Sequence, residues 1–187
     1  MWLIFLVLWL AWGVFWLVKA RDVKVAEQME TRADRLAHVV PLVVAAVLLA
    51  PPGAFPVWPL DARFVPPSLG LAVAGAVLTA AGLAFAVWAR VTIGRNWSGY
   101  VSVKQDHALV VDGPYAWVRH PIYTGLLLAF LGSALAIGEW RALLATLIAG
   151  VALWRKLSRE ERLMTARFGA AYGAYASRVP ALIPFLP

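Results

Sequence analysis

The sequence predicts an all-α integral membrane protein with about five transmembrane helices, the last two of which form a helical hairpin. The first observation is composition, because 62% of the 187 residues are hydrophobic and only 14% are charged, which lies outside the range of soluble globular domains. The second is that long apolar runs alternate with short segments that carry the charged residues. Five such runs and their connections use nearly all of the chain, so we expect one domain, residues 1–187.

A helix that crosses about 30 Å of hydrocarbon needs roughly 20 apolar residues, and five runs approach that length. The second run is short and contains Pro41, which predicts a kink or an extension into the proline-rich segment that follows. Only residues 139–141 separate the fourth and fifth runs, and so short a connection predicts a tight hairpin. The five predicted spans are residues 2–18, 36–50, 68–89, 122–138 and 142–154.

The first run resembles a secretory signal in length, but its flanks differ from those of a signal. No basic residue precedes it, no small-residue cleavage site follows it, and Lys19, Arg21 and Lys24 come directly after it. These flanks predict a retained span with a cytoplasmic end.

The net charge of +7 is distributed by loop. Fifteen of the 17 lysines and arginines fall in residues 19–35, 90–121 and 155–178, and the other two are Arg63 and Arg141. Because cytoplasmic loops accumulate basic residues, this pattern predicts an N-terminus outside and a C-terminus in the cytoplasm, in a cell inner membrane. It also explains the basic charge without nucleic acid, for which the chain offers no polar domain.

The spans themselves carry little chemistry. Gly70, Gly75 and Gly82 in the third span predict close helix packing. The chain has no cysteine, which excludes disulfides, a thiolate nucleophile and a cysteine-based metal site. Two candidate histidines, His107 and His120, lack the clustered ligands of a metal site, so we expect no metal.

Polar side chains are dense enough to form a site in two segments, residues 90–123 and 155–178. The predicted topology brings both segments to the cytoplasmic face. A site at that end of a helix bundle could take a soluble molecule from water and an apolar one from the bilayer.

These two segments carry a family resemblance. The run TIGRNWSGYVSVKQDHALVVDGPYAWVRHPIYTG and the later run REERLMTARFGAAYGAYASRVPALIPFLP resemble the isoprenylcysteine carboxyl methyltransferase family, membrane enzymes related to phospholipid N-methyltransferases. The shared features include His-x-Leu-Val, Gly-x-Tyr, Arg-His-Pro-x-Tyr-x-Gly, a Glu-Glu pair and Phe-Gly-x-x-Tyr. The agreement of several separated elements in order makes the match more specific than one short motif. It covers residues 90–187, the expected catalytic half, and leaves residues 1–89 as a three-span N-terminal part.

The resemblance implies an S-adenosyl-L-methionine pocket formed by the 90–121 loop and the C-terminal tail. It also implies that a basic residue near the acid pair contacts the substrate. That position falls at Lys156, with Arg155 beside it, and Arg119 is a further cation that could serve the reaction. The expected catalytic residues are therefore Arg119, Lys156 and Arg155. The residues that the resemblance assigns to the cofactor are His107, Leu109, Val110, Tyr115, His120, Pro121, Tyr123 and Glu160.

These assignments agree with the chemistry of the cofactor. Its amine requires an acid such as Glu160, its carboxylate requires donors such as Arg119 or His120, and its sulfonium and adenine require aromatic walls. Methyl transfer is an in-line displacement that depends on positioning more than on a strong acid or base. A carboxylate acceptor is already deprotonated at neutral pH, so it needs no general base.

The expected reaction is carboxyl O-methylation of a lipophilic, isoprenylcysteine-like acid that enters from the membrane. Phospholipid N-methylation and thiol S-methylation are alternatives. An NADPH-dependent membrane reductase of the sterol type and a non-enzymatic membrane module are alternatives from other classes. No G-x-G-x-x-G motif follows a strand pattern, so a soluble Rossmann enzyme is not supported.

Simpler interpretations of the same residues also exist. Arg119, His120 and Pro121 fit an ordinary helix entry, and Glu160 fits a salt-bridged helix surface. Glu161, one residue further along a helix, is expected to point elsewhere. Tyr172 and Tyr175 are expected to pack or to lie at the membrane interface, and His38 is expected to mark the cytoplasmic end of the second span.

Overall fold

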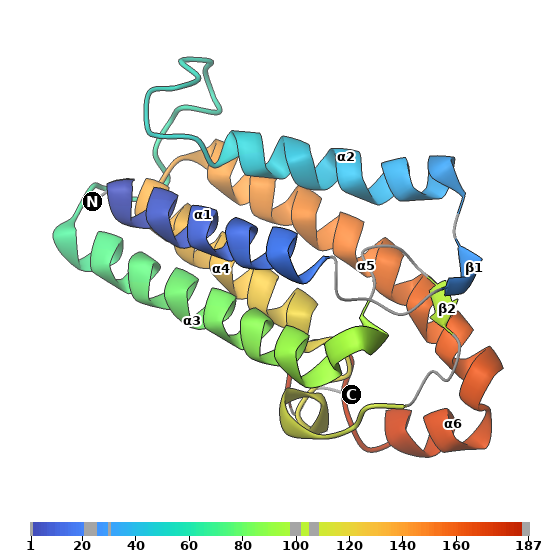
Figure 1. The fold of residues 1–187 in the computed structure, drawn as a ribbon. Helices are drawn as coiled ribbons and strands as arrows, with labels where there is room; N and C mark the ends of the chain where they lie inside the picture. Colours follow the sequence, from blue (N-terminus) through green and yellow to red (C-terminus); the bar gives the residue numbers. More distant parts are fainter. Residues whose placement is uncertain (1, 21–25, 30, 98–101, 105–108, 185–187) are drawn as a thin grey trace.

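The computed structural model describes residues 2–20, 26–29, 31–97, 102–104 and 109–184. Five long helices lie side by side, and a short sixth helix packs near one end of them, where the chain also ends (Figure 1). Two short strands at that same end pair in an antiparallel ladder. The elements are α1 (Trp2–Lys19), β1 (Ala26–Met29), α2 (Arg32–Leu48), α3 (Leu69–Ile93), η1 (Gly94–Asn96), β2 (Ser102–Lys104), η2 (Gly113–Ala116), α4 (Pro121–Ile137), α5 (Trp140–Phe168) and α6 (Ala170–Ala176).

Each of the five predicted runs corresponds to one of the helices α1 to α5. The largest difference is in α5, which continues to Phe168 instead of ending at 154. The added segment consists mainly of good helix formers and contains neither Gly nor Pro before Gly169. The helix ends there because Gly169 adopts a φ of +51°, which favours glycine.

Among the residues that the structure describes, two helical segments are long and apolar enough to cross a membrane, Trp2–Lys19 and Leu69–Asn96. Helix α4 is apolar but shorter, while α2 has Arg32, Asp34 and Arg35 in its first turns. The described structure therefore supports the all-helical bundle and two of its membrane crossings. The five-span topology stays a prediction.

Helices α3 and α4 make the closest helix contact of the bundle through paired glycines. A Cβ atom on Gly82 would lie 2.5 Å from the carbonyl oxygen of Gly125, and a Cβ on Gly75 would lie 2.5 Å from that of Gly132. Backbones this close leave no space for a side chain. The prediction of close packing is confirmed for Gly75 and Gly82 but not for Gly70, where an added Cβ would come no nearer than 3.9 Å to a neighbour.

The hairpin between α4 and α5 is confirmed, and a buried arginine fixes it to α2. Gly138 ends α4 with a φ of +69°. Arg141 is fully buried and pairs with Glu139 at 2.6 Å. Its guanidinium also donates hydrogen bonds to the carbonyl oxygens of Ala50 (2.9 Å) and Pro51 (3.0 Å), just after the end of α2. A cation at this position stabilises the carbonyl end of a helix.

Candidate functional site

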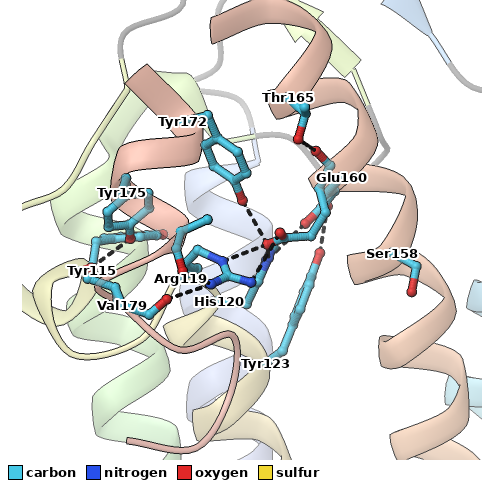
Figure 2. Close-up of polar contacts among 12 residues, drawn as sticks. Tyr115, Arg119, His120, Tyr123, Ser158, Glu160, Thr165, Tyr172, Tyr175 and Val179 are labelled. Carbon is cyan, nitrogen blue, oxygen red and sulfur yellow. Dashed lines mark hydrogen bonds and ion pairs between the residues drawn. The ribbon is translucent and has the colours of Figure 1, made fainter. Parts of the chain in front are cut away.

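The candidate site lies at the end of the bundle where α4 begins, α5 projects beyond its neighbours and the C-terminal segment returns (Figure 1). Arg119 and His120 directly precede α4 and Tyr123 lies in its first turn, and these side chains face Glu160 on α5 (Figure 2). Tyr172 reaches the same group of side chains from α6. The site therefore joins the start of α4 to the consecutive helices α5 and α6, which come later in the sequence.

His120 lies between two carboxylates. Its Nε2 is 2.6 Å from Oε1 of Glu161, and its Nδ1 is 3.5 Å from Oε2 of Glu160. The ring stacks on Tyr123 with 5.6 Å between centroids and 3° between planes. Burial alone would lower the pKa of His120, but the hydrogen bonds and negative charges of Glu160 and Glu161 raise it above its ordinary value. The arrangement favours the imidazolium form.

Glu160 is held in its ionised form by its neighbours. The hydroxyl of Tyr123 donates a 2.6 Å hydrogen bond to its Oε1. Burial would raise the pKa of Glu160, but the hydrogen bond to His120, the charge of Lys156 and the Tyr123 hydroxyl together lower it. The Lys156 ammonium is itself largely buried and lies 5.8 Å from the centre of the Tyr123 ring.

Glu161 has more polar partners than Glu160. Arg119 donates from Nε to Oε1 (2.9 Å) and from Nη2 to Oε2 (3.1 Å), and the Tyr172 hydroxyl donates to Oε1 at 2.7 Å. Burial raises the pKa of Glu161, but His120, Arg119 and Tyr172 lower it to about 2. The prediction that Glu161 points elsewhere is wrong. Successive helix positions diverge by about 100°, but its partners approach from α4 and α6 and meet the long side chain.

The C-terminal segment is fixed against the start of α4 by backbone and side-chain hydrogen bonds. The amides of Arg119 and His120 donate to the carbonyls of Pro180 (2.8 Å) and Ala181 (3.0 Å). Tyr175 donates to the carbonyl of Tyr115 at 2.6 Å. The expected meeting of the loop before α4 with the tail is therefore present. The rings of Tyr172 and Tyr175 are buried, as a packing role requires, but both hydroxyls also take part in the site.

The other predicted cofactor residues lie around this group. Tyr115 is buried among apolar side chains that include Ile122 and Leu153, and burial, with the charge of Glu160, raises its pKa. Val110 packs against that cluster, and Pro121 is the first residue of α4. Leu109 is partly buried, and His107 lies outside the described residues.

The predicted catalytic residues separate in the structure. Lys156 is buried beside Tyr123, whereas Arg155 is exposed, because adjacent residues of α5 point in different directions. Arg119 donates to Glu161 and also to the carbonyls of Ala176 (3.0 Å) and Val179 (2.5 Å). Its guanidinium therefore serves contacts within the protein.

His38, predicted to mark the cytoplasmic end of the second span, also lies near the site, on α2. Its side chain is buried, its Nδ1 lies 3.1 Å from the carbonyl oxygen of Asp34, and it interacts electrostatically with Lys156 and Glu160. Arg159 pairs with Asp34 at 2.7 Å and joins the same two helices. The signal for the buried face of α2 in the sequence is the helical spacing of His38, Leu42 and Ala45.

An apolar cavity of about 610 Å³ lies between α1, α2 and α4. Its walls include Trp9 and Gly13 of α1, Leu42 of α2, and Leu126 of α4. Leu42 and Leu126 also pack against the cluster that contains Tyr115 and Tyr123. The cavity therefore borders the polar site through shared side chains. Among the described residues, no group of three metal-binding side chains is found.

The fold and the site define a small helical membrane protein with a polar, acid-rich site at one end of its bundle. The sequence model of the family described as Phospholipid methyltransferase matches residues 71–171. The chain therefore belongs to this family, and its relatives place it with the isoprenylcysteine carboxyl methyltransferases.

Two curated relatives illustrate the similarity. The chain is 36% identical over 105 residues to protein-S-isoprenylcysteine O-methyltransferase of Schizosaccharomyces pombe, a match that covers 53% of this chain and 43% of the relative. It is 37% identical over 98 residues to the cobalt-zinc-cadmium resistance protein CzcN of Cupriavidus metallidurans, covering 51% and 44%. The chain thus spans about half the length of the curated relatives that it matches.

The chain is also similar to a solved structure. The intramembrane Ras methyltransferase isoprenylcysteine carboxyl methyltransferase, a eukaryotic protein, matches with a TM-score of 0.59 and 26% sequence identity. The match covers 85% of this chain and 55% of that one.

Proposed function

We propose that the protein transfers a methyl group from S-adenosyl-L-methionine to the carboxylate of a lipophilic, isoprenylcysteine-like acceptor. The observation that carries this proposal is the partly buried Glu160, held ionised between Tyr123, His120 and Lys156 at the end of an apolar bundle. The family relationship and the matching motifs support the same reaction.

The side chains of the site fit the functional groups of this cofactor. Glu160 offers a carboxylate to the cofactor's amine, and protonated His120 offers a cation to its carboxylate. The rings of Tyr115 and Tyr123 offer faces to the sulfonium and the adenine. His107, Leu109, Val110 and Pro121 complete the proposed set by resemblance. When bound, the cofactor supplies an electrophilic methyl group.

The cations of the site have different proposed roles. Lys156 is buried next to Tyr123 and is suited to hold an anionic acceptor close to the site. Arg155 faces away, so we assign it no contact with the acceptor. Arg119 is engaged by Glu161 and the tail, so we assign it a positioning role.

The acceptor's apolar chain is proposed to lie in the cavity between α1, α2 and α4. The cavity is apolar and shares Leu42 and Leu126 with the cluster around Tyr123. A chain lying there would remove apolar surface from water and would bring its polar end to the site. No general base is needed, because a carboxylic acid is already ionised at neutral pH.

We place the site on the cytoplasmic side of a cell inner membrane, with the N-terminus outside. The support is the distribution of lysines and arginines, which gather at the site's end of the bundle. In this arrangement residues 1–89 supply spans, residues 90–187 form the catalytic half, and the whole chain is one domain.

Calorimetry on the purified protein tests the cofactor assignment. S-adenosyl-L-methionine and its demethylated product should both bind, and Glu160→Gln should weaken binding about tenfold or more, because an ion-paired hydrogen bond is lost. Ser158→Ala on the same helix is the control, since its hydroxyl bonds only to its own helix at Trp154. Binding of NADPH with no binding of adenosylmethionine would overturn the proposal.

A methyl-transfer assay with apolar acids, amines and thiols of equal chain length tests the acceptor. Acids should react best. Lys156→Gln should raise the KM for the acid about tenfold, whereas Lys156→Arg, which keeps the cation, should retain most of the activity. Preference for an amine would instead assign lipid N-methylation.

A further inference from the structure

The two adjacent acids of α5 are engaged to different degrees. Glu161 contacts Nε2 of His120 at 2.6 Å, but Glu160 contacts Nδ1 at 3.5 Å, which is long for a charged hydrogen bond. A ligand cation that drew Glu160 away would therefore leave His120 fixed through Nε2. The ring would keep both its orientation and a carboxylate that stabilises its proton.

Glu161 also connects α5 to the tail. It accepts directly from the Tyr172 hydroxyl, and it orients Arg119, whose Nη1 donates to the carbonyls of Ala176 and Val179. Relative exposures of 22% for Glu161 and 14% for Arg119 show that water reaches this pair only in part. Interactions at such a position are screened less than those at a fully exposed surface.

The tail has further attachments that do not involve Glu161. The backbone amides of Arg119 and His120 bond to Pro180 and Ala181, and Thr124 donates to the carbonyl of Leu182 at 2.7 Å. Loss of the Glu161 charge should therefore loosen α6 and the segment after it without unfolding the helix bundle.

We propose that Glu161 is the positioning residue of this site: it fixes His120 through Nε2 and holds the tail, residues 170–182, against the start of α4. Glu160 is then left as the acid that meets the ligand. This division of roles rests on the proposed function only for the identity of that ligand. The attachment of the tail is a property of the protein without ligand.

Limited proteolysis of the full chain in detergent, without ligand, tests the attachment. Trypsin should cut after Arg178, an exposed residue that follows α6, and mass spectrometry follows the released C-terminal peptide. Glu161→Gln should be cut about tenfold faster, because charge-assisted hydrogen bonds that hold the tail are weakened. Glu160→Gln is the matched control and should be cut at the wild-type rate. Tyr172→Phe, which removes one hydroxyl, should be cut at a rate between those of the wild type and Glu161→Gln.

Nuclear magnetic resonance of the histidine side chains tests the other part of the proposal, that Glu161 fixes His120 through Nε2. The groups that face His120 are Glu160 and Glu161 from α5, Arg119 beside it, Tyr123 on α4 and Tyr172 on α6, with Lys156 acting through Glu160. Glu161→Gln should lower the midpoint of the His120 titration more than Glu160→Gln does, because the Glu161 contact is shorter. Tyr172→Phe should leave that midpoint close to the wild-type value.

Equal cleavage of wild type and Glu161→Gln, or an unchanged His120 titration, would overturn the proposal. If Glu161→Gln fails to fold, Tyr172→Phe decides, and an unchanged cleavage rate in that variant overturns the tail attachment. Failure of the wild type to bind S-adenosylhomocysteine would contradict the proposed function alone, because neither measurement above uses a ligand.

Discussion

The hydroxyl of Tyr123 offers a direct test of a single contact, because it donates a 2.6 Å hydrogen bond to Glu160. Tyr123→Phe keeps the ring and its stacking on His120 but removes this bond. The carboxylate then loses one donor that stabilises its charge, at a cost of about 1.5–3 kcal/mol. We expect the affinity for S-adenosylhomocysteine, measured by calorimetry, to fall about tenfold or more. An affinity equal to that of wild type would show that the hydroxyl does not organise the cofactor's site.

His120 and Glu161 give the protein an expected pH dependence. The pKa of His120 is raised, so its stabilising charge is complete below its ordinary value of 6.5 and is lost as the pH rises through the raised value. The pKa of Glu161 is lowered from 4.5 to about 2, so its contribution is complete above 4.5 and is lost as the pH falls toward 2.

The contribution of this pair is therefore greatest between pH 4.5 and 6.5. Thermal unfolding at stepped pH should show a melting temperature that declines on the alkaline side of this window. His120→Gln should remove most of that alkaline decline, since the titrating group is gone. An identical decline in the variant would assign it to another group.

Single residues of the site were only partly predictable from the sequence. His120, Tyr123 and Glu160 belong to spaced motifs, and the structure brings the three together. The partners of Glu161 are 42 and 41 residues away at Arg119 and His120. Helix periodicity describes directions within one element, so it gave no information about side chains that arrive from other elements.

At the scale of elements, the contact between α3 and α4 depends on its glycines. Gly82→Ala would put a Cβ 2.5 Å from the carbonyl oxygen of Gly125, so the two helices must separate. We expect a loss of about 1–3 kcal/mol of stability, measured as a lower melting temperature in detergent. Gly70→Ala in the same helix is the control, because nothing lies closer than 3.9 Å to its added Cβ. Equal melting temperatures for the two variants would contradict this account.

The hairpin that joins α4 and α5 depends on the buried Arg141. Arg141→Met would leave Glu139 buried without its ion pair and would leave the carbonyls of Ala50 and Pro51 without this donor. Breaking a buried pair in this way costs about 3–5 kcal/mol. The melting temperature should therefore fall strongly. The double variant Glu139→Gln with Arg141→Met should recover part of the loss, because no buried charge then remains.

The elements were predictable to different degrees. Apolar runs predicted the five long helices, and the short connection predicted the hairpin at Gly138. The strands β1 and β2 have four and three residues, too few to show an alternating pattern. Hydrophobicity predicts only the apolar part of α5, to residue 154, because the segment that continues to Phe168 is a polar helix stabilised by its contacts with α4 and α6.

At the scale of the whole molecule, the cavity between α1, α2 and α4 provides a test of the acceptor's path. Gly13 lines this cavity, and an added Cβ there meets nothing within 4 Å. Gly13→Leu should therefore fill part of the space and raise the KM for long-chain acceptors several-fold, with little effect on short-chain acceptors or on the cofactor. Ala11→Leu, on the same helix but outside the cavity wall, is the control. Equal effects on long and short acceptors would argue against an acceptor chain in this cavity.

The arrangement of the molecule followed from the sequence in outline. Charge distribution and the two polar segments predicted that the loop before α4 and the tail meet at one end of the bundle, and Arg119 and His120 do bond to Pro180 and Ala181. The inward face of α2, with His38, was not predicted because nothing in a single apolar run states which neighbour it will meet. Such information resides in contacts between helices, and these form only in the folded chain.

We expect the unbroken course of α5 to set the depth in the membrane at which the proposed reaction occurs. Glu160 follows the exposed Trp154 by six residues on the same helix, a rise of about 9 Å along the axis. Because tryptophan favours the boundary between hydrocarbon and headgroups, we expect Glu160 to lie among the headgroups rather than among the acyl chains. Under the proposed function, we therefore expect the acceptor to present its reacting group outside the acyl chains, at a height that the rigid helix α5 fixes.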